Sequence, residues 1–212
     1  GHGFSVALGY VVTNETSRAS SWLNWHTSLN SGSPGTTYRL NQNSTTRQTS
    51  TANYWGSTGM TSTVMGYGTA VSLAASQNVT VFYWHSVAGY SSFESYAGKD
   101  VDGTPTNNFD GPMINTGFNP SSILIKGISA DTNWQWSTEA TNPVQGNPNT
   151  GFIVANTTAV IVTNTTPWDF LSNGAKVRVT SDAQSITGRL YIYCMWGGRP
   201  MTSGGINQGR AK

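Results

Sequence analysis

The chain has 212 residues, of which only 9% are charged, while Gly, Ser, Thr and Asn together make up nearly half. A net charge of +2, carried by scattered Lys and Arg, excludes the basic stripe that binding to a nucleic-acid backbone requires. Eight Trp and nine Tyr argue against a disordered chain, and the low charge argues against an ordinary cytosolic monomer. The single cysteine, Cys194, excludes an internal disulfide framework, and no apolar run is long enough to predict membrane insertion.

Alternation of apolar and polar residues predicts strands along most of the chain, because helical periodicity is nearly absent. In chain order, we expect strands at residues 79–84, 92–96, 113–114, 122–126, 176–180 and 190–196. Turn signals such as Asn119-Pro120 and the segment 172–175 separate these runs. The pattern predicts an all-β, mostly antiparallel fold of β-sandwich or jelly-roll-like units.

One series of aromatic residues occurs twice, which predicts two related units. Trp22 matches Trp134 and Trp84 matches Trp196, both at an offset of 112 residues, and residues 9–12 match residues 122–125. We therefore expect a first β unit at residues 1–88, a second at 89–201 and an extended C-terminal tail at 202–212. Residues present in both halves are most simply core anchors, so Trp84 and Trp196 are predicted to be buried.

Residue patterns typical of catalysis are scarce. Asp169 and Asp182 are the best-placed carboxylates for a glycosidase, but we interpret both as turn or capping residues. Cys194 lies inside an apolar strand and is interpreted as a small buried hydrophobic residue rather than a nucleophile. The sequence therefore predicts no enzymatic activity and no cofactor.

Metal-binding patterns are weak as well. His26 and His85 are too dispersed for a zinc signature, and a hydrogen-bonded structural role is the better interpretation. Asp100, Asp102 and Asp110 only faintly resemble a calcium loop, and an ordinary turn explains them better. We predict no metal site.

Aromatic residues beside polar loops are the remaining binding candidates. Trp25, Tyr54 and Trp136 lack the support of the repeat or lie out of register with it, so we predict that they are exposed rather than core residues. Exposed Trp and Tyr next to Asn and Thr suit stacking on the faces of sugars. These three residues are the predicted binding residues.

A family resemblance adds to this interpretation. Residues 89–98, GYSSFESYAG, resemble the G-Y-S-x-F-G-S-Y-x-G segment of a family of tailed-phage virion proteins that is common in marine and cyanobacterial phages. Further motifs follow in that family's order at residues 110–112, 116–120, 123–126, 131–134, 170–174, 176–178, 191–193 and 196. The resemblance implies a tail-fibre-like module on the virion surface and implies no catalytic residues.

The leading functional hypothesis is a structural virion surface protein, a tail-fibre or adhesin module for attachment to the host. The alternative is a capsid decoration protein that stabilises the phage head, and a carbohydrate-active enzyme is the third hypothesis. The expected partners are other copies of the chain, as a trimer, other virion proteins and a host surface glycan. An oligomer would cover edge strands and apolar surface.

Overall fold

The computed structural model describes residues 1–17, 19–50, 53–68, 78–99, 111–141, 146–163, 167–178 and 184–198. Strands dominate these residues, and all of their strand pairs are antiparallel. The all-β, mostly antiparallel fold class expected from the sequence is confirmed. The strands are β1 (Tyr10–Glu15), β2 (Leu23–His26), β3 (Tyr38–Asn41), β4 (Thr49–Ser50), β5 (Val79–Trp84), β6 (Ser91–Ala97), β7 (Met113–Asn115), β8 (Pro120–Gly127), β9 (Gln135–Thr138), β10 (Ile153–Val154), β11 (Trp168–Leu171), β12 (Gly174–Val177) and β13 (Leu190–Gly197). Two short 3₁₀ helices, η1 (Leu29–Gly32) and η2 (Glu139–Thr141), interrupt them.

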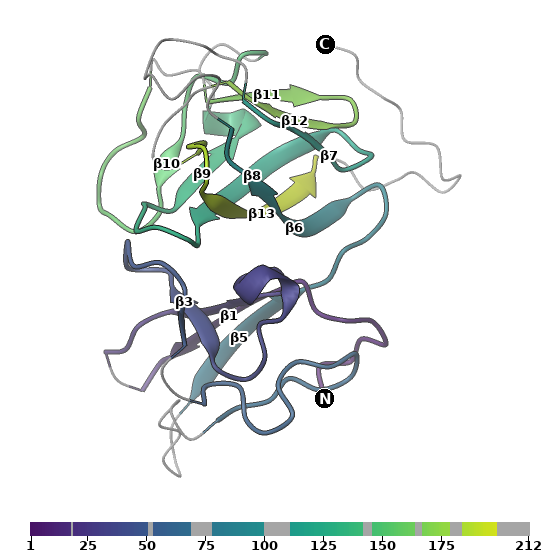
Figure 1. Cartoon of the computed structure of the whole chain (residues 1–212), viewed down its shortest axis with the longest axis vertical. Coiled ribbons are helices and arrows are strands. Elements are labelled where there is room, and N and C mark those ends of the chain that lie inside the picture. Colours follow the sequence, from purple (N-terminus) through teal and green to yellow (C-terminus); the bar gives the residue numbers. More distant parts are fainter. Residues whose placement is uncertain are drawn as a thin grey trace.

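The strands form three sheets. The first sheet has the order β4-β3-β2-β1-β5, the second β10-β9-β8-β13-β6 and the third β11-β12-β7. The second and third sheets make up the upper part of the molecule in Figure 1, and the first sheet makes up the lower part. We keep the names first unit and second unit for residues 1–88 and 89–201. That boundary remains a prediction; β5 ends at Trp84 in the first sheet and β6 begins at Ser91 in the second.

Three apolar clusters hold the layers together, and strand alternation assigns residues to them. Along β8, Ile123 and Ile125 point into the cluster between the second and third sheets, while Leu124 points toward the first sheet. The cluster between the first and second sheets combines Tyr10 and Val12 of β1 with residues of the second unit. A third cluster, with Trp55 at its centre, covers the other face of the first sheet through loop residues rather than through strands. The second unit is thus a two-sheet sandwich, and the first unit is one sheet covered by loops.

The central strands of the two units pair in the same way. Tyr10 lies opposite Trp84 and His26, and Ser122 lies opposite Trp196 and Thr138, so each position is repeated after 112 residues. The sequence match of residues 9–12 with 122–125 is therefore wrong by one residue, since Tyr10 corresponds to Ser122 and not to Ile123. A shift of one residue exchanges the two faces of a strand. The sequence could not reveal this shift, because Ile123, Leu124 and Ile125 are all apolar and buried, and β8 therefore shows no alternation that would fix its register.

Hydrogen bonds join the two units. Lys126 Nζ donates to the carbonyl oxygens of Thr45 and Thr132, each at 2.7 Å, and so links a loop of the first unit to one of the second. Trp134 Nε1 donates to the Asn41 oxygen at 2.9 Å. Since these donors are fully buried, a substitution that removed one of them within the folded protein would leave its carbonyl partner without that hydrogen bond.

Several expected elements differ in detail. The strand expected at 176–180 begins earlier, at Gly174, after a turn at Ser172 and Asn173, and residues 179 and 180 lie outside the described residues. The strand expected at 113–114 is β7, which pairs with β12 in the third sheet. The predicted tail 202–212, the weak calcium loop and Asp182 also lie outside the described residues.

Candidate functional site: an aromatic cleft between the units

A cleft of about 830 Å³ lies between the first and second units. This volume falls within the usual range of small-molecule sites. Both units contribute to its walls. The first unit supplies Tyr10, Val12, Trp22, Gln42, Asn43, Phe82 and Trp84, and the second supplies Ser122, Leu124, Trp136, Ala155, Asn156, Thr157, Thr158 and Trp196.

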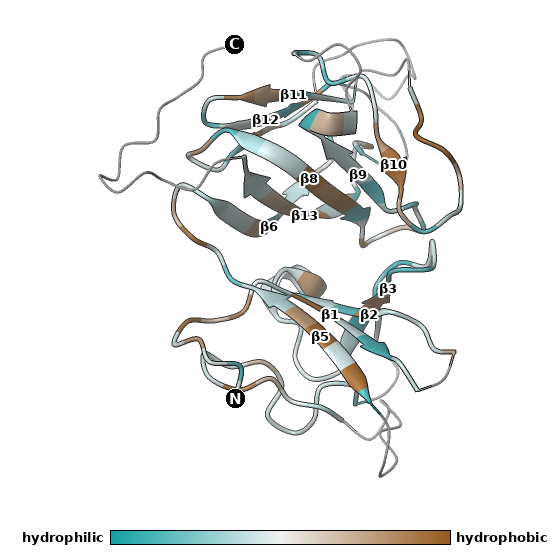
Figure 2. Ribbon diagram, turned by 180° about the vertical axis from the view of Figure 1, so that it is seen from behind, coloured by the Kyte–Doolittle hydropathy of each residue, from teal (hydrophilic) through white to brown (hydrophobic). Residues whose placement is uncertain are grey.

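Strand alternation builds the wall of the first unit. Phe82 and Trp84 lie two residues apart on β5, so their rings are on the same face of the strand. Figure 2 shows β5 beside β1 in the first sheet. The two rings stack with centroids 6.3 Å apart, and Trp84 stacks on Tyr10 at 5.5 Å. Phe82 is 46% exposed, so the outer end of this stack faces solvent.

The wall of the second unit carries Trp136 and Trp196. Trp136 lies on β9 opposite Leu124, is 42% exposed, and donates a hydrogen bond from Nε1 to Ser122 Oγ at 2.7 Å. Trp196 lies edge-on to Trp84, with centroids 5.9 Å apart, so the two walls are in contact through these rings. These contacts fix the ring orientations before any ligand arrives.

The polar groups of the cleft are amides and hydroxyls. Tyr10 donates its hydroxyl hydrogen to Asn24 Oδ1 at 2.5 Å, with Gln42 Oε1 at 3.1 Å. Burial raises the pKa of Tyr10 well above its ordinary value, so the hydroxyl remains neutral. Among the described residues that line the cleft, none carries a charged side chain. The site can therefore offer flat apolar faces and neutral hydrogen-bonding groups.

The three predicted binding residues lie in different places. Trp136 lies in the cleft, and its predicted exposure is confirmed. Tyr54 is half-buried outside the cleft lining, under the Arg39 guanidinium, which lies 4.3 Å from the ring centroid. The predicted exposure of Trp25 is wrong, since only 5% of this residue is accessible. The register of β2 places Trp25 opposite Val11, so its side chain points into the cluster around Trp55.

The sequence prediction missed two exposed cleft residues. Trp22 is 42% exposed although its counterpart Trp134 is fully buried, and Phe82 was not singled out. The signal for Phe82 was present, because alternation within residues 79–84 places it on the same face as Trp84. Trp84 and Trp196, predicted to be core, are only partly buried and both pack on the central cluster and line the cleft.

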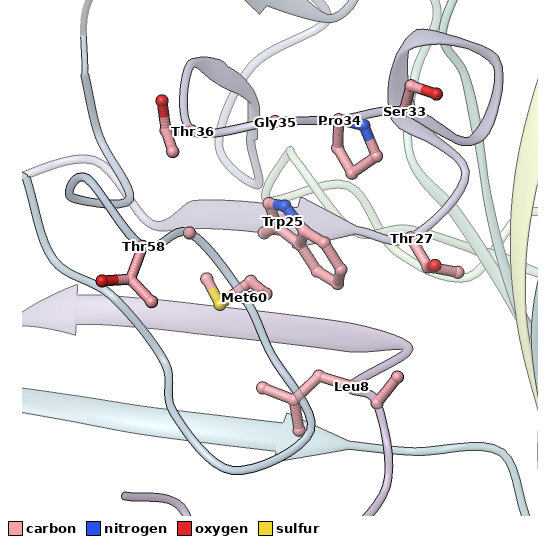
Figure 3. A pocket seen from close by; sticks show the side chains of 11 residues that line it. Leu8, Trp25, Thr27, Ser33, Pro34, Gly35, Thr36, Thr58 and Met60 are labelled. Carbon is pink, nitrogen blue, oxygen red and sulfur yellow. The ribbon is translucent and has the colours of Figure 1, made fainter.

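A smaller pocket of about 410 Å³ lies on the other side of the first sheet (Figure 3). Trp25 lies among its lining residues, between the segment Ser33–Thr36 and the side chains of Thr58, Met60 and Leu8. Trp25 Nε1 has no hydrogen-bond partner among the described residues. This nitrogen is itself buried, so the polar groups of the pocket are instead the hydroxyls of Thr27, Ser33, Thr36 and Thr58.

The other candidate residues have structural partners. His26 is fully buried, with Nε2 3.1 Å from the Tyr193 oxygen, while its Nδ1 accepts a hydrogen bond from the Ser28 backbone. Burial lowers the pKa of His26 to about 4. Asp169 Oδ2 forms an ion pair with Arg178 Nε at 3.2 Å, and burial raises the pKa of the Cys194 thiol.

The described part of the chain contains no cluster of three or more His, Cys, Asp or Glu side chains placed to bind a metal. It also contains no helix with the length and apolar character needed to cross a membrane.

The fold and the site together define an all-β protein whose two similarly paired units enclose an aromatic, uncharged cleft. The chain belongs to the family described as "Domain of unknown function (DUF7483)", whose model matches residues 1–200. This match spans both units. No curated protein and no solved structure gives a significant match to the chain.

Proposed function

We propose that this protein is a non-catalytic structural protein on the surface of a tailed-phage particle, where it serves attachment by binding a host surface glycan. The observation that carries the proposal is the cleft, which gathers four of the eight tryptophans of the chain. Exposed apolar surface of this kind marks an interaction site, and three of its rings, Trp22, Phe82 and Trp136, are more than 40% exposed. Sugars offer apolar ring faces for such stacking and hydroxyls for the amide groups of the rim.

Binding rather than catalysis is proposed because of the chemistry of the cleft. Hydrolysis of a glycosidic bond requires an acid and a second carboxylate on opposite sides of that bond. The described lining residues include no Asp or Glu, and the described candidate Asp169 is held by Arg178 elsewhere. The virion location rests on the sequence resemblance and on the low charge of the chain.

The test is retention of the purified chain on immobilised neutral bacterial polysaccharides. We expect the wild type to be retained on at least one of them, Trp136→Ala to pass through, and Tyr90→Ala to be retained. Tyr90 is a matched control because it is an aromatic residue of similar exposure, 37%, that does not line the cleft. Shortening of the polysaccharide during incubation would contradict the non-catalytic proposal, and equal retention of all three proteins would contradict the cleft as the site.

A capsid decoration protein is the second candidate. The observation in its favour is the apolar character of the cleft, which a neighbouring shell subunit would also cover. Quantitative mass spectrometry of purified particles separates the two. Hundreds of copies per particle would indicate the head, whereas at most a few tens would indicate the tail and agree with attachment.

A further inference from the structure

The cleft has two walls, and each unit supplies exposed aromatic rings to one of them. Trp22 and Phe82 belong to the first unit, and Trp136 belongs to the second. A ligand that stacks on rings of both walls must bridge the junction between the units. The cleft volume of about 830 Å³ lies in the upper part of the range for small-molecule sites and exceeds what one sugar ring fills.

The stacking surfaces are ordered in the unliganded protein. Trp136 is held through Nε1 by Ser122 Oγ, and Phe82 is held by the stack that continues through Trp84 to Tyr10. The Trp22 indole Nε1 lies 3.0 Å from the side-chain oxygen of Asn14 once that amide is oriented to satisfy its neighbours. Since rigid rings lose little conformational entropy on binding, each ring can contribute its full contact with the ligand.

The lining also restricts the chemistry of the ligand. An extended peptide would bind by adding a strand to a sheet edge, whereas the cleft lies over the faces of the sheets. Val12 and Leu124 line it from paired central strands, and the edge strand β5 lines it through the side chains of Phe82 and Trp84, which point away from the hydrogen-bonding edge. A phospholipid surface would require basic residues, and the described lining contains none. Uncharged amides and hydroxyls from Gln42, Asn156 and Thr157 suit neutral hydroxyl groups instead.

We infer that the cleft selects a neutral oligosaccharide long enough to contact both walls at once, and discriminates against single sugars. This inference rests on the proposed glycan binding and adds the length and charge of the ligand. It makes the two walls interdependent. Removing an exposed aromatic ring from either wall should abolish the gain in affinity that a longer oligosaccharide provides, because the other wall contacts only one end of the ligand.

Isothermal titration calorimetry with linear gluco-, manno- and galacto-oligosaccharides, from mono- to hexasaccharide, tests the inference. In at least one series we expect affinity to rise about tenfold or more between the monosaccharide and the longer chains, as one added stacking contact would give. Trp22→Ala and Trp136→Ala should each lower the affinity for the hexasaccharide about tenfold and flatten the length dependence. Tyr90→Ala should behave as the wild type.

Thermal melting curves of all four proteins establish that the variants are folded. A monosaccharide that binds as tightly as a hexasaccharide would overturn the inference while leaving glycan binding intact. The inference would likewise be overturned, with glycan binding intact, if only one of the two tryptophan substitutions lowered the affinity for the hexasaccharide. Absence of binding in every neutral series would overturn the inference and, if no polysaccharide retains the protein either, the proposed function as well. Tighter binding of apolar peptides than of any sugar would also contradict it.

Discussion

The burial of His26 makes the stability of the fold depend on pH. One tautomer satisfies both ring nitrogens, because Nε2–H donates to the Tyr193 oxygen of the second unit and Nδ1 accepts from the Ser28 backbone. A second proton would place N–H against N–H at Ser28. Burial lowers the pKa of His26 from 6.5 to about 4, and the hydrogen bond to the Tyr193 carbonyl, which acts to raise the pKa, only partly offsets this effect.

The direction and size of the effect follow from linkage. Above about pH 6.5 both the folded and the unfolded chain hold a neutral His26, and its full contribution is present. Between pH 6.5 and 4 only the unfolded chain takes up the proton, so the free energy of unfolding falls as the pH falls. The loss attributable to His26 amounts to about 2 kcal/mol between pH 6.5 and 5 and about 3 kcal/mol by pH 4.

Urea titrations followed by tryptophan fluorescence measure this loss. His26→Gln keeps one donor and one acceptor but does not titrate, and His85→Gln is the matched control at a half-buried histidine. We expect His26→Gln to remove about 2 kcal/mol of the decline between pH 6.5 and 5, and His85→Gln to leave the wild-type decline in place. The reasoning is refuted if the wild type and His26→Gln lose equal stability over this interval.

Three further variants test contacts on which the account depends. A Cβ on Gly9 would lie 2.6 Å from Phe93 Cδ2 and 2.8 Å from Phe93 Cβ, so Gly9→Ala should cost about 1–3 kcal/mol in urea titrations and clearly less in a Phe93→Gly background, which removes both atoms; an equal cost in both backgrounds would refute this contact. Burial lowers the pKa of Lys126 to about 8 from 10.5, so the folded chain releases its proton first. Stability should therefore rise with pH above 8, by about 2 kcal/mol to pH 9.5 relative to Lys126→Met, and parallel curves would contradict this. Asp169→Asn breaks a partly exposed ion pair and should cost less than about 1 kcal/mol, with no polysaccharide turnover by either protein.

Local patterns predicted the strands best where alternation was long and turn residues bounded it. The strand expected at 79–84 is β5 with the same bounds, and 190–196 lies within β13. The pairing of β7 with β12 could not be read from the sequence, because the two strands are about 60 residues apart and both are short. Local periodicity does not identify the partner of a strand.

The candidate site was only partly predictable for a related reason. Trp22 and Trp134 occupy equivalent positions before β2 and β9, yet Trp134 is covered by the first unit through its bond to Asn41, whereas Trp22 stands at the open cleft. The predicted exposure of Trp25 was wrong because its burial depends on the loop cluster around Trp55. A repeat predicts equivalent positions in the chain, but the packing of one unit on the other makes their environments different.

The indole N–H signals of the eight tryptophans test the central claim most directly. When the protein is titrated with a neutral oligosaccharide that it binds, we predict shifts in the ¹H–¹⁵N correlation spectrum for the indole signals of the four cleft residues, Trp22, Trp84, Trp136 and Trp196. The signals of Trp25, Trp55, Trp134 and Trp168, which do not line the cleft, should remain in place. Shifts confined to this second group, or no shift at a saturating concentration of the glycan, would contradict the aromatic cleft as the binding site.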